Sequence, residues 1–171
     1  LMGDIQVHRK KKSNLTFLTM EEEHTISTLW EQNGCSEICS KEDLWQAAKS
    51  DEMLIQLRGG DDASGASEQQ YEERFWRRKL DGIALDIVGK KCYLIEFKRT
   101  RDRRHSYEER AMKVARQQYK SLLSGLQAVG QQKGWKVEQL VFVGGTCGSV
   151  NVETFNQNLK LLEVPEGKWS R

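Results

Sequence analysis

The sequence predicts an α/β domain in which helices flank a mixed central β-sheet. After residue 65, hydrophobic patterns typical of helices and strands follow in the order helix, strand, strand, helix, strand, helix. At 171 residues, the chain is also long enough to bury a core of its own. We expect an N-terminal helical and basic extension over residues 1–58 and the main core over 65–171, packed together as one globular unit.

The first part of the chain predicts short helices after a basic start. Residues 1–16 are polar and basic around RKKKSN, which predicts a free tail or an edge strand. Residues 19–32 predict a short helix, because the acidic residues near its start favour the helix dipole, and Gly34 ends it. A second short helix is expected over 40–49, with Ser40 as its N-cap.

The remaining elements follow a long loop. MLIQL at 53–57 fits either a strand or a further helical turn, and the Gly-, Asp- and Ser-rich run at 59–67 predicts the loop. The expected core elements are a helix from 68 that becomes extended towards 79, a strand pair within 80–102, a helix over 106–130, a strand over 136–145 and a closing helix over 151–164. The helix over 106–130 carries a stripe at helical spacing, formed by Ala111, Val114, Ala115, Gln118, Leu122 and Leu126.

Composition limits the classes of function. Hydrophobic residues make up 37% and charged residues 30% of the chain, as in a soluble globular protein, and the net charge of +2 does not require a polyanionic partner. No run approaches the ~20 apolar residues of a membrane helix, and because the apolar residues near the start form no h-region, we expect no signal peptide there. The scattered cysteines indicate reduced thiols of an intracellular protein, nuclear or cytoplasmic. The opening LMGDIQV, without an initiator methionine at position 1, indicates an excised or processed domain.

The strand pair LDGIALDIVGKKCYLIEFK carries charges that an apolar hairpin normally excludes. With Gly89 and Lys90 as turn residues, the predicted pairs are Val88 with Lys91, Ile83 with Glu96, and Asp81 with Lys98. Because side chains alternate between faces, Asp81, Glu96 and Lys98 should share one face at the open end, and Asp86 should point to the other. A four-residue turn would preserve these faces.

Two carboxylates beside an ammonium group suggest metal-assisted chemistry on a phosphate. Carboxylate oxygens are hard ligands suited to Mg²⁺ or Mn²⁺. A nearby lysine can lower the pKa of an attacking water or stabilise charge that develops on the phosphate.

The pattern resembles the signature of the PD-(D/E)xK nucleases, the restriction-endonuclease-like superfamily. Asp81 precedes Glu96-Phe97-Lys98 by fifteen residues, over a resemblance that spans roughly 65–150. It implies a restriction-endonuclease-like core, Asp81 and Glu96 as metal ligands, the Phe97 carbonyl as a further ligand, and Lys98 as the catalytic lysine. The chain departs from the pattern at Leu80, where many members have proline.

The same resemblance implies two further residues. Many members add a glutamate from a preceding helix, for which Glu72 and Glu73 are candidates and Glu21, Glu22 and Glu23 are rivals. Some members place a glutamine on the helix after E-x-K, and Gln118 is the candidate because it interrupts an apolar stripe.

A basic segment follows the E-x-K motif. Arg99, Arg101, Arg103 and Arg104 could hold the nucleic-acid backbone through guanidinium–phosphate pairs. A solvated loop whose arginines pair with Asp102, Glu108 and Glu109 is the alternative.

Other patterns predict less chemistry. Cys35 and Cys39 with His24 could suggest a zinc site, but a fourth ligand is missing and the spacing of the cysteines is unusual. Cys147 lies in GGTCGS, which predicts a tight strand-to-helix turn rather than a nucleophile. The tryptophans at helical positions, Trp30, Trp45 and Trp76, predict core packing.

The expected function is therefore a Mg²⁺- or Mn²⁺-dependent DNA endonuclease, either a resolvase-like enzyme or a module of a mobile element. A homodimer is plausible because duplex cleavage needs two cuts. The alternative is an inactive nuclease fold that serves as a nucleic-acid-binding or dimerisation module, and a plain protein-interaction domain is a third interpretation.

Overall fold

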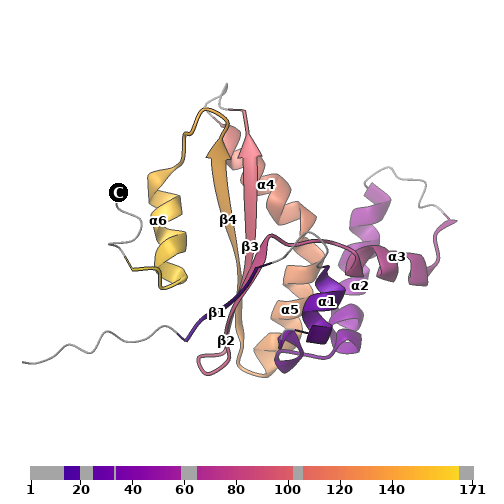
Figure 1. The fold of residues 1–171 in the computed structure, drawn as a ribbon. Coiled ribbons are helices and arrows are strands. Elements are labelled where there is room, and N and C mark those ends of the chain that lie inside the picture. The colour runs from indigo at the N-terminus through magenta and orange to yellow at the C-terminus, as the bar shows by residue number, and fades with distance from the viewer. Residues whose placement is uncertain (1–13, 20–24, 33, 59–64, 102–105, 166–171) are drawn as a thin grey trace, which may run out of the picture.

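A small mixed sheet lies at the centre of the computed structural model, which describes residues 14–19, 25–32, 34–58, 65–101 and 106–165 (Figure 1). Its four strands are β1 (Thr16–Thr19), β2 (Gly82–Asp86), β3 (Lys91–Thr100) and β4 (Lys136–Gly145), in the spatial order β1-β2-β3-β4. The β1–β2 and β2–β3 pairs are antiparallel and the β3–β4 pair is parallel. The predicted α/β class with a mixed sheet is confirmed.

Helices cover both faces of this sheet. They are α1 (Ile26–Gln32), the 3₁₀ turn η1 (Cys35–Glu37), α2 (Lys41–Arg58), α3 (Glu68–Trp76), α4 (Tyr107–Gln118), α5 (Lys120–Gln132) and α6 (Val152–Leu161). Figure 1 shows α6 alone on one side of the sheet and α1 to α5 on the other. Within the described residues, no helix combines the length and apolar character needed to cross a membrane.

The N-terminal elements differ from the prediction in their bounds. The expected helix over 19–32 begins only at Ile26 among the described residues, and Thr19 ends the edge strand β1 instead. Residues 20–24 lie outside the described part of the chain. The predicted cap of α2 is confirmed, because the Ser40 hydroxyl accepts the Asp43 N–H at 3.0 Å. The ambiguous stretch 53–57 is helical and belongs to α2.

The expected continuous helix over 106–130 is broken at one residue, Tyr119. Its backbone leaves helical geometry, with φ −113° and ψ 17°, so that α4 ends and α5 begins there. Two interactions fix the break: Arg78 donates to the Gln118 carbonyl at 3.1 Å, and the Tyr119 hydroxyl donates to the Lys79 carbonyl. Neither partner is visible to a local helical pattern.

The stripe predicted for this helix is correct in part. Ala115, Leu122 and Leu126 are fully buried, whereas Val114 is 59% exposed and Gln118 is exposed as well. Tyr119, which the pattern omitted, occupies the buried face instead.

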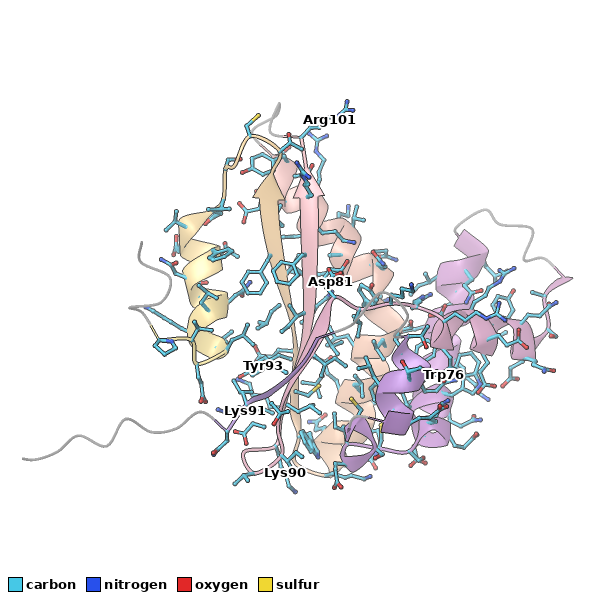
Figure 2. The ribbon with its side chains drawn as sticks, viewed as in Figure 1. Trp76, Asp81, Lys90, Lys91, Tyr93 and Arg101 are labelled. Carbon is cyan, nitrogen blue, oxygen red and sulfur yellow. The ribbon has the colours of Figure 1, made fainter. Side chains whose placement is uncertain are left out.

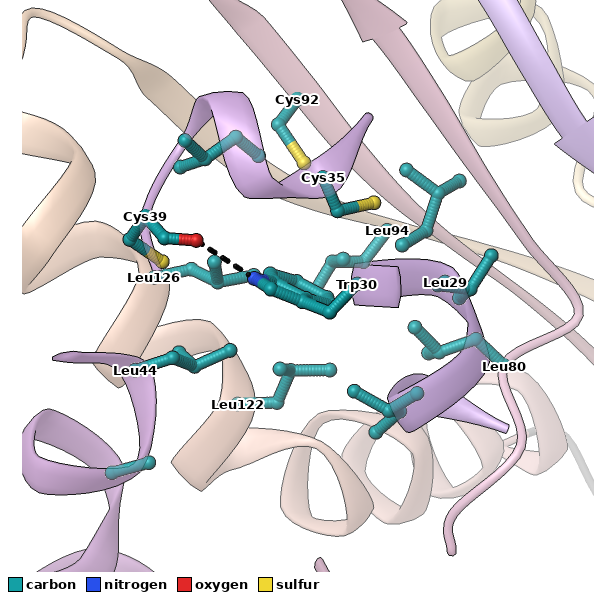
Figure 3. Packing of buried hydrophobic residues seen from close by; sticks show 14 of the residues in the cluster. Leu29, Trp30, Cys35, Cys39, Leu44, Leu80, Cys92, Leu94, Leu122 and Leu126 are labelled. Atoms are coloured by element: carbon teal, nitrogen blue, oxygen red, sulfur yellow. Dashed lines mark hydrogen bonds between the residues drawn. The ribbon is translucent and has the colours of Figure 1, made fainter. Parts of the chain in front are cut away.

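The main hydrophobic cluster fills the space between the sheet and α1, α2, α3 and α5 (Figure 3). As predicted, Trp30, Trp45 and Trp76 are buried in it, and the Trp30 indole N–H donates to the Cys39 carbonyl at 3.1 Å. Residues of α1 and α2 therefore share one core with β2, β3 and α5.

Three thiols lie in that cluster. Burial raises the pKa of Cys35 to about 12 and that of Cys39 to about 11, so both remain protonated thiols near neutral pH. Cys92 is buried beside them (Figure 3). Among the described residues, no group of three or more His, Cys, Asp or Glu side chains is arranged to hold a metal ion, and His24 lies outside that part of the chain.

The opposite face of the sheet packs against α6. Ala84, Tyr93, Ile95, Leu140 and Phe142 form this second cluster with residues of α6 and its C-terminal turn. The alternation of buried side chains along β3 therefore divides its residues between two cores, one on each face.

Candidate active site

The β2–β3 hairpin sets the geometry of the site, and its register differs from the prediction. Asp86 pairs with Lys91 and Ile83 pairs with Leu94, so residues 87–90 form a four-residue turn. The predicted pairs Val88–Lys91, Ile83–Glu96 and Asp81–Lys98 are wrong by two residues. Because a shift of two residues preserves the alternation, the predicted sharing of faces holds, with Ile83 and Leu85 on the same face as Cys92 and Leu94.

Asp86 explains the register. Its carboxylate accepts the Gly89 N–H at 2.7 Å and is 5% exposed, so it caps the turn from inside. A Cβ atom on Gly89 would lie only 2.2 Å from the Asp86 Oδ2, so a larger residue there would require the Asp86 carboxylate to move. Lys90 completes the turn with a positive φ of 50°. As predicted, Asp86 does not share the face of Asp81.

At the other end of the hairpin, Glu96, Lys98 and Gln118 are in contact. The Lys98 Nζ lies 2.5 Å from the Glu96 Oε1 and donates to the Gln118 Oε1 at 2.8 Å. The Glu96 side chain is almost fully buried, whereas the Lys98 side chain is 23% exposed. The structure therefore joins three of the predicted site residues, from β3 and from the C-terminus of α4, with the lysine at the surface.

Asp81 completes this group from the residue before β2. Extending the register by one pair places Asp81 opposite Glu96. The Asp81 Oδ2 accepts the Phe97 N–H at 2.6 Å, which fixes the carboxylate against β3 just before the start of β2. Figure 2 shows Asp81 part of the way along β3, well before Arg101 at its far end. Asp81, Glu96, Lys98 and Gln118 are called the carboxylate cluster below.

One oxygen of this cluster lacks a partner. The Glu96 Oε2 is buried and has no hydrogen-bond donor among the described residues. Burial raises the pKa of Glu96, the Lys98 ammonium opposes that effect, and the charge of Asp81 adds to it. The Tyr119 hydroxyl also lowers the pKa of Glu96, although its geometry does not make it a hydrogen-bond donor to the Oε2. A buried carboxylate with an unsatisfied oxygen beside a second carboxylate is stabilised by a further cation.

The cluster fits a hard divalent cation on its donor chemistry. Asp81 and Glu96 supply carboxylate oxygens, and Mg²⁺ commonly keeps several waters when only one or two carboxylates hold it. The missing partner of the Glu96 Oε2 is the structural observation that supports this fit. The Phe97 N–H is taken by Asp81, and a role for the Phe97 carbonyl stays a prediction.

Tyr119 is a member of the site that the sequence analysis missed. It is 1% exposed, its hydroxyl accepts the Gln118 amide at 3.0 Å, and it donates to the Lys79 carbonyl. Burial first, and then the charges of Glu96 and Asp81, raise the pKa of Tyr119 far above its usual range. The signal was available, because Tyr119 lies four residues after Ala115 and three before Leu122 on the buried stripe.

A second buried charge, also missed, supports the break at Tyr119. Glu52 of α2 is 0% exposed and pairs with the Arg78 guanidinium. Its carboxylate also accepts from the Ser121 hydroxyl and from the Gln56 amide. Arg78 in turn donates to the Gln118 carbonyl, so this network ties α2 to the junction that presents Gln118 to Lys98. Leu44, Ala48 and Glu52 follow at helical spacing, which was the available signal.

The remaining predicted residues lie elsewhere. Glu73 is exposed on α3, 3.9 Å from Arg77, and it lines a different pocket together with Glu72, so the structure does not bring either to the carboxylate cluster. Glu72 accepts the Trp76 indole N–H at 3.2 Å. The rival acids Glu21, Glu22 and Glu23 lie outside the described residues.

The predicted arginines are placed only in part. Arg99 is exposed near the end of β3, and Arg101 is exposed just after the strand ends (Figure 2). Arg103 and Arg104 lie outside the described residues, as does Asp102.

Comparisons with known proteins add no family to this geometry. No family model, curated protein or solved structure matches the chain.

Proposed function

We propose that the protein is a divalent-metal-dependent endonuclease that hydrolyses phosphodiester bonds in DNA, on a restriction-endonuclease-like core. The observation that carries this proposal is the carboxylate cluster. Two carboxylates, a lysine and a glutamine from separate segments meet near the end of the β2–β3 hairpin away from its turn, and the buried Glu96 Oε2 is left without a donor. Most buried carboxylate oxygens have a hydrogen-bond donor, so this oxygen is available to a cation.

In this proposal, Asp81 and Glu96 hold Mg²⁺ or Mn²⁺. Bound there, the cation would polarise a phosphoryl oxygen and lower the pKa of a water ligand. Asp81 is already fixed by the Phe97 N–H, so it requires little reorganisation to act as a ligand.

Lys98 stabilises the negative charge that develops on the phosphate. The Lys98 side chain is partly exposed, so a phosphate can reach it, and contacts with Glu96 and Gln118 fix its position. Gln118 is a positioning residue, because it acts on Lys98 and is itself held by Tyr119 and by the Arg78 contact to its carbonyl. Fixed donors of this kind stabilise a transition state without reorganising.

A nucleic-acid substrate is favoured by the charges at the end of β3. Arg99 and Arg101 are exposed beyond Lys98, where guanidinium groups can bind the phosphates that flank the cleaved bond. Because each chain has one such site, cleavage of both DNA strands would take a homodimer. Either a resolvase or a mobile-element endonuclease would use the carboxylate cluster and the exposed arginines in this way.

Cleavage of labelled linear, flapped and four-way-junction DNA in Mg²⁺, Mn²⁺ or chelator tests the proposal. The informative variant is Lys98→Met, and its matched control is Lys136→Met. Lys136 also pairs with a glutamate two residues away on its strand, Glu138 at 2.6 Å, but it lies at the opposite end of the sheet and is exposed. We expect metal-dependent cleavage that Lys98→Met reduces by at least ~100-fold and Lys136→Met leaves intact. Equal loss in both variants, or cleavage that persists in chelator, would refute the assignment.

A further inference from the structure

A groove of about 520 Å³ lies on the side of β3 and β4 that faces α6, within the ~300–1,000 Å³ typical of ligand pockets. Phe97 and Arg99 of β3, Phe142 and Gly144 of β4, the loop after β4 and Phe155 of α6 line it. Because side chains alternate along β3, Phe97 and Arg99 point to the face opposite Glu96. Lys98 touches both places: its ammonium contacts Glu96, and the residue also borders the groove.

An exposed aromatic ring forms one wall of this groove. Phe97 stacks on Phe142, with ring centroids 5.1 Å apart and an interplanar angle of 23°, and yet it remains 59% exposed. Phe142 is buried and makes an edge-to-face contact with Phe155, with ring centroids 5.2 Å apart. This contact fixes the ring on which Phe97 stacks. A flat ring supported on one side and open on the other offers a stacking surface to a second flat group.

The charge and the backbone of the groove indicate the kind of group that would stack there. Among the described residues, no carboxylate lines the groove, and the exposed Arg99 has no ion-pair partner. Gly144 pairs with Arg99 in register, and a Cβ atom built on it would meet nothing within 4 Å. Glycine within a strand is often found where a ligand approaches the backbone closely.

We propose that this groove binds an unpaired nucleotide of the substrate, with its base stacked on Phe97 and its phosphate beside Arg99. A base inside a duplex already has both faces covered by its neighbours, so only an unpaired base can use this surface. The inference rests on the proposed function and names its substrate class: DNA with a single-stranded segment next to the cleaved bond, such as a flap or a branch.

Binding measured without cleavage tests the proposal. Fluorescence anisotropy in chelator compares the full chain on a blunt duplex, on the same duplex with a single-stranded tail, and on the tailed duplex with abasic sites in the tail. Phe97→Ala removes the stacking surface, and Gly144→Leu fills the groove without removing any aromatic ring. Gly65→Leu is the matched control, because Gly65 also has open space around its Cβ position and does not line the groove. Thermal unfolding of every variant checks that it is folded.

We expect the wild type and Gly65→Leu to bind the tailed duplex roughly five- to a hundredfold more tightly than the blunt one, as a stacked base would give. Phe97→Ala, Gly144→Leu and the abasic tail should each abolish that preference while binding to blunt duplex remains. Equal binding of tailed and blunt duplex by the wild type, or a preference for the tailed duplex that survives both variants, would overturn the groove assignment but leave the proposed function standing. If the wild type binds none of these DNAs, the proposed function fails together with it.

Discussion

The buried pair of Glu52 and Arg78 supports a prediction whose size follows from the structure. Glu52 is 0% exposed, whereas the Arg78 side chain keeps 19% of its surface in contact with solvent. Replacing Arg78 by methionine leaves a carboxylate in the core without its cation, with only the Ser121 hydroxyl and the Gln56 amide as donors. Removing one partner of a buried ion pair typically costs about 3–5 kcal/mol.

That cost is a large part of the ~5–15 kcal/mol by which a domain is usually stable. For a chain of this size, each kcal/mol shifts the midpoint of thermal unfolding by ~2–4 °C, so we expect Arg78→Met to lower Tm by about 6–20 °C. Glu52→Gln should cost less, because the cation that it leaves is partly solvated and keeps its contact with the Gln118 carbonyl. The combined Glu52→Gln/Arg78→Met variant should recover part of the loss, since no buried charge remains.

The assay is urea and thermal unfolding of the wild type, both single variants and the double variant, monitored by circular dichroism. The double-mutant cycle should give a coupling free energy of about 1–3 kcal/mol between the two residues. Additive losses, or a loss below ~1 kcal/mol in Arg78→Met, would refute the argument that this pair is a buried and mutually dependent unit.

Three further predictions concern the site and the core. Burial raises the pKa of Glu96, so the folded state binds its proton more tightly than the unfolded state, and stability falls as pH rises from the ordinary carboxyl range through the elevated pKa. Glu96→Gln should therefore raise Tm more at pH 7 than at pH 4, in contrast to the control Glu138→Gln, which replaces a half-buried glutamate on β4. A gain that is independent of pH would contradict the burial argument. Tyr119→Phe removes the hydroxyl that joins Gln118 to the Lys79 carbonyl, so we expect a loss of about 1–3 kcal/mol in urea unfolding and slower cleavage, whereas unchanged stability would show that the hydroxyl is not needed. Gly125→Val should destabilise by ~1–3 kcal/mol or more, because a Cβ there already lies 3.0 Å from the Ala48 Cβ, and a stable variant would mean that α2 and α5 can separate freely.

Most elements were predictable because their signals are local. The Ser40 cap of α2, the strand character of β3 and β4, and the helices α3 and α6 each follow from residues within one or two turns or one strand. The same holds for the shared face of Ile83 and Leu94, which depends only on alternation.

The predictions were wrong where a side-chain contact, or a contact with a distant part of the chain, determines the register of a hairpin or the end of a helix. The hairpin register depends on the Asp86 carboxylate, which caps a four-residue turn instead of leaving Gly89 and Lys90 as a two-residue one. The break at Tyr119 depends on Arg78 and Lys79, some forty residues earlier in the chain.

Part of the candidate site was predictable because its residues lie close together on one hairpin. The rest was missed because it depends on contacts between elements that are distant in the sequence. Asp81, Glu96 and Lys98 were found because one hairpin carries all three. Tyr119 and Glu52 were missed because a polar group on a buried stripe can be recognised only when its partner on another element is known. Glu73 was a candidate because the resemblance implies a glutamate on the preceding helix, and in the structure Glu73 lines a different pocket.

The claim that Asp81 and Glu96 hold a divalent cation is tested most directly by titrating the full chain with Mn²⁺ and following free Mn²⁺ by electron paramagnetic resonance. Wild type should be compared with Glu96→Gln and with the control Glu138→Gln. We predict about one bound Mn²⁺ per chain for wild type and for the control, and loss of that binding in Glu96→Gln. Equal Mn²⁺ binding by all three proteins, or none by the wild type, would contradict the account.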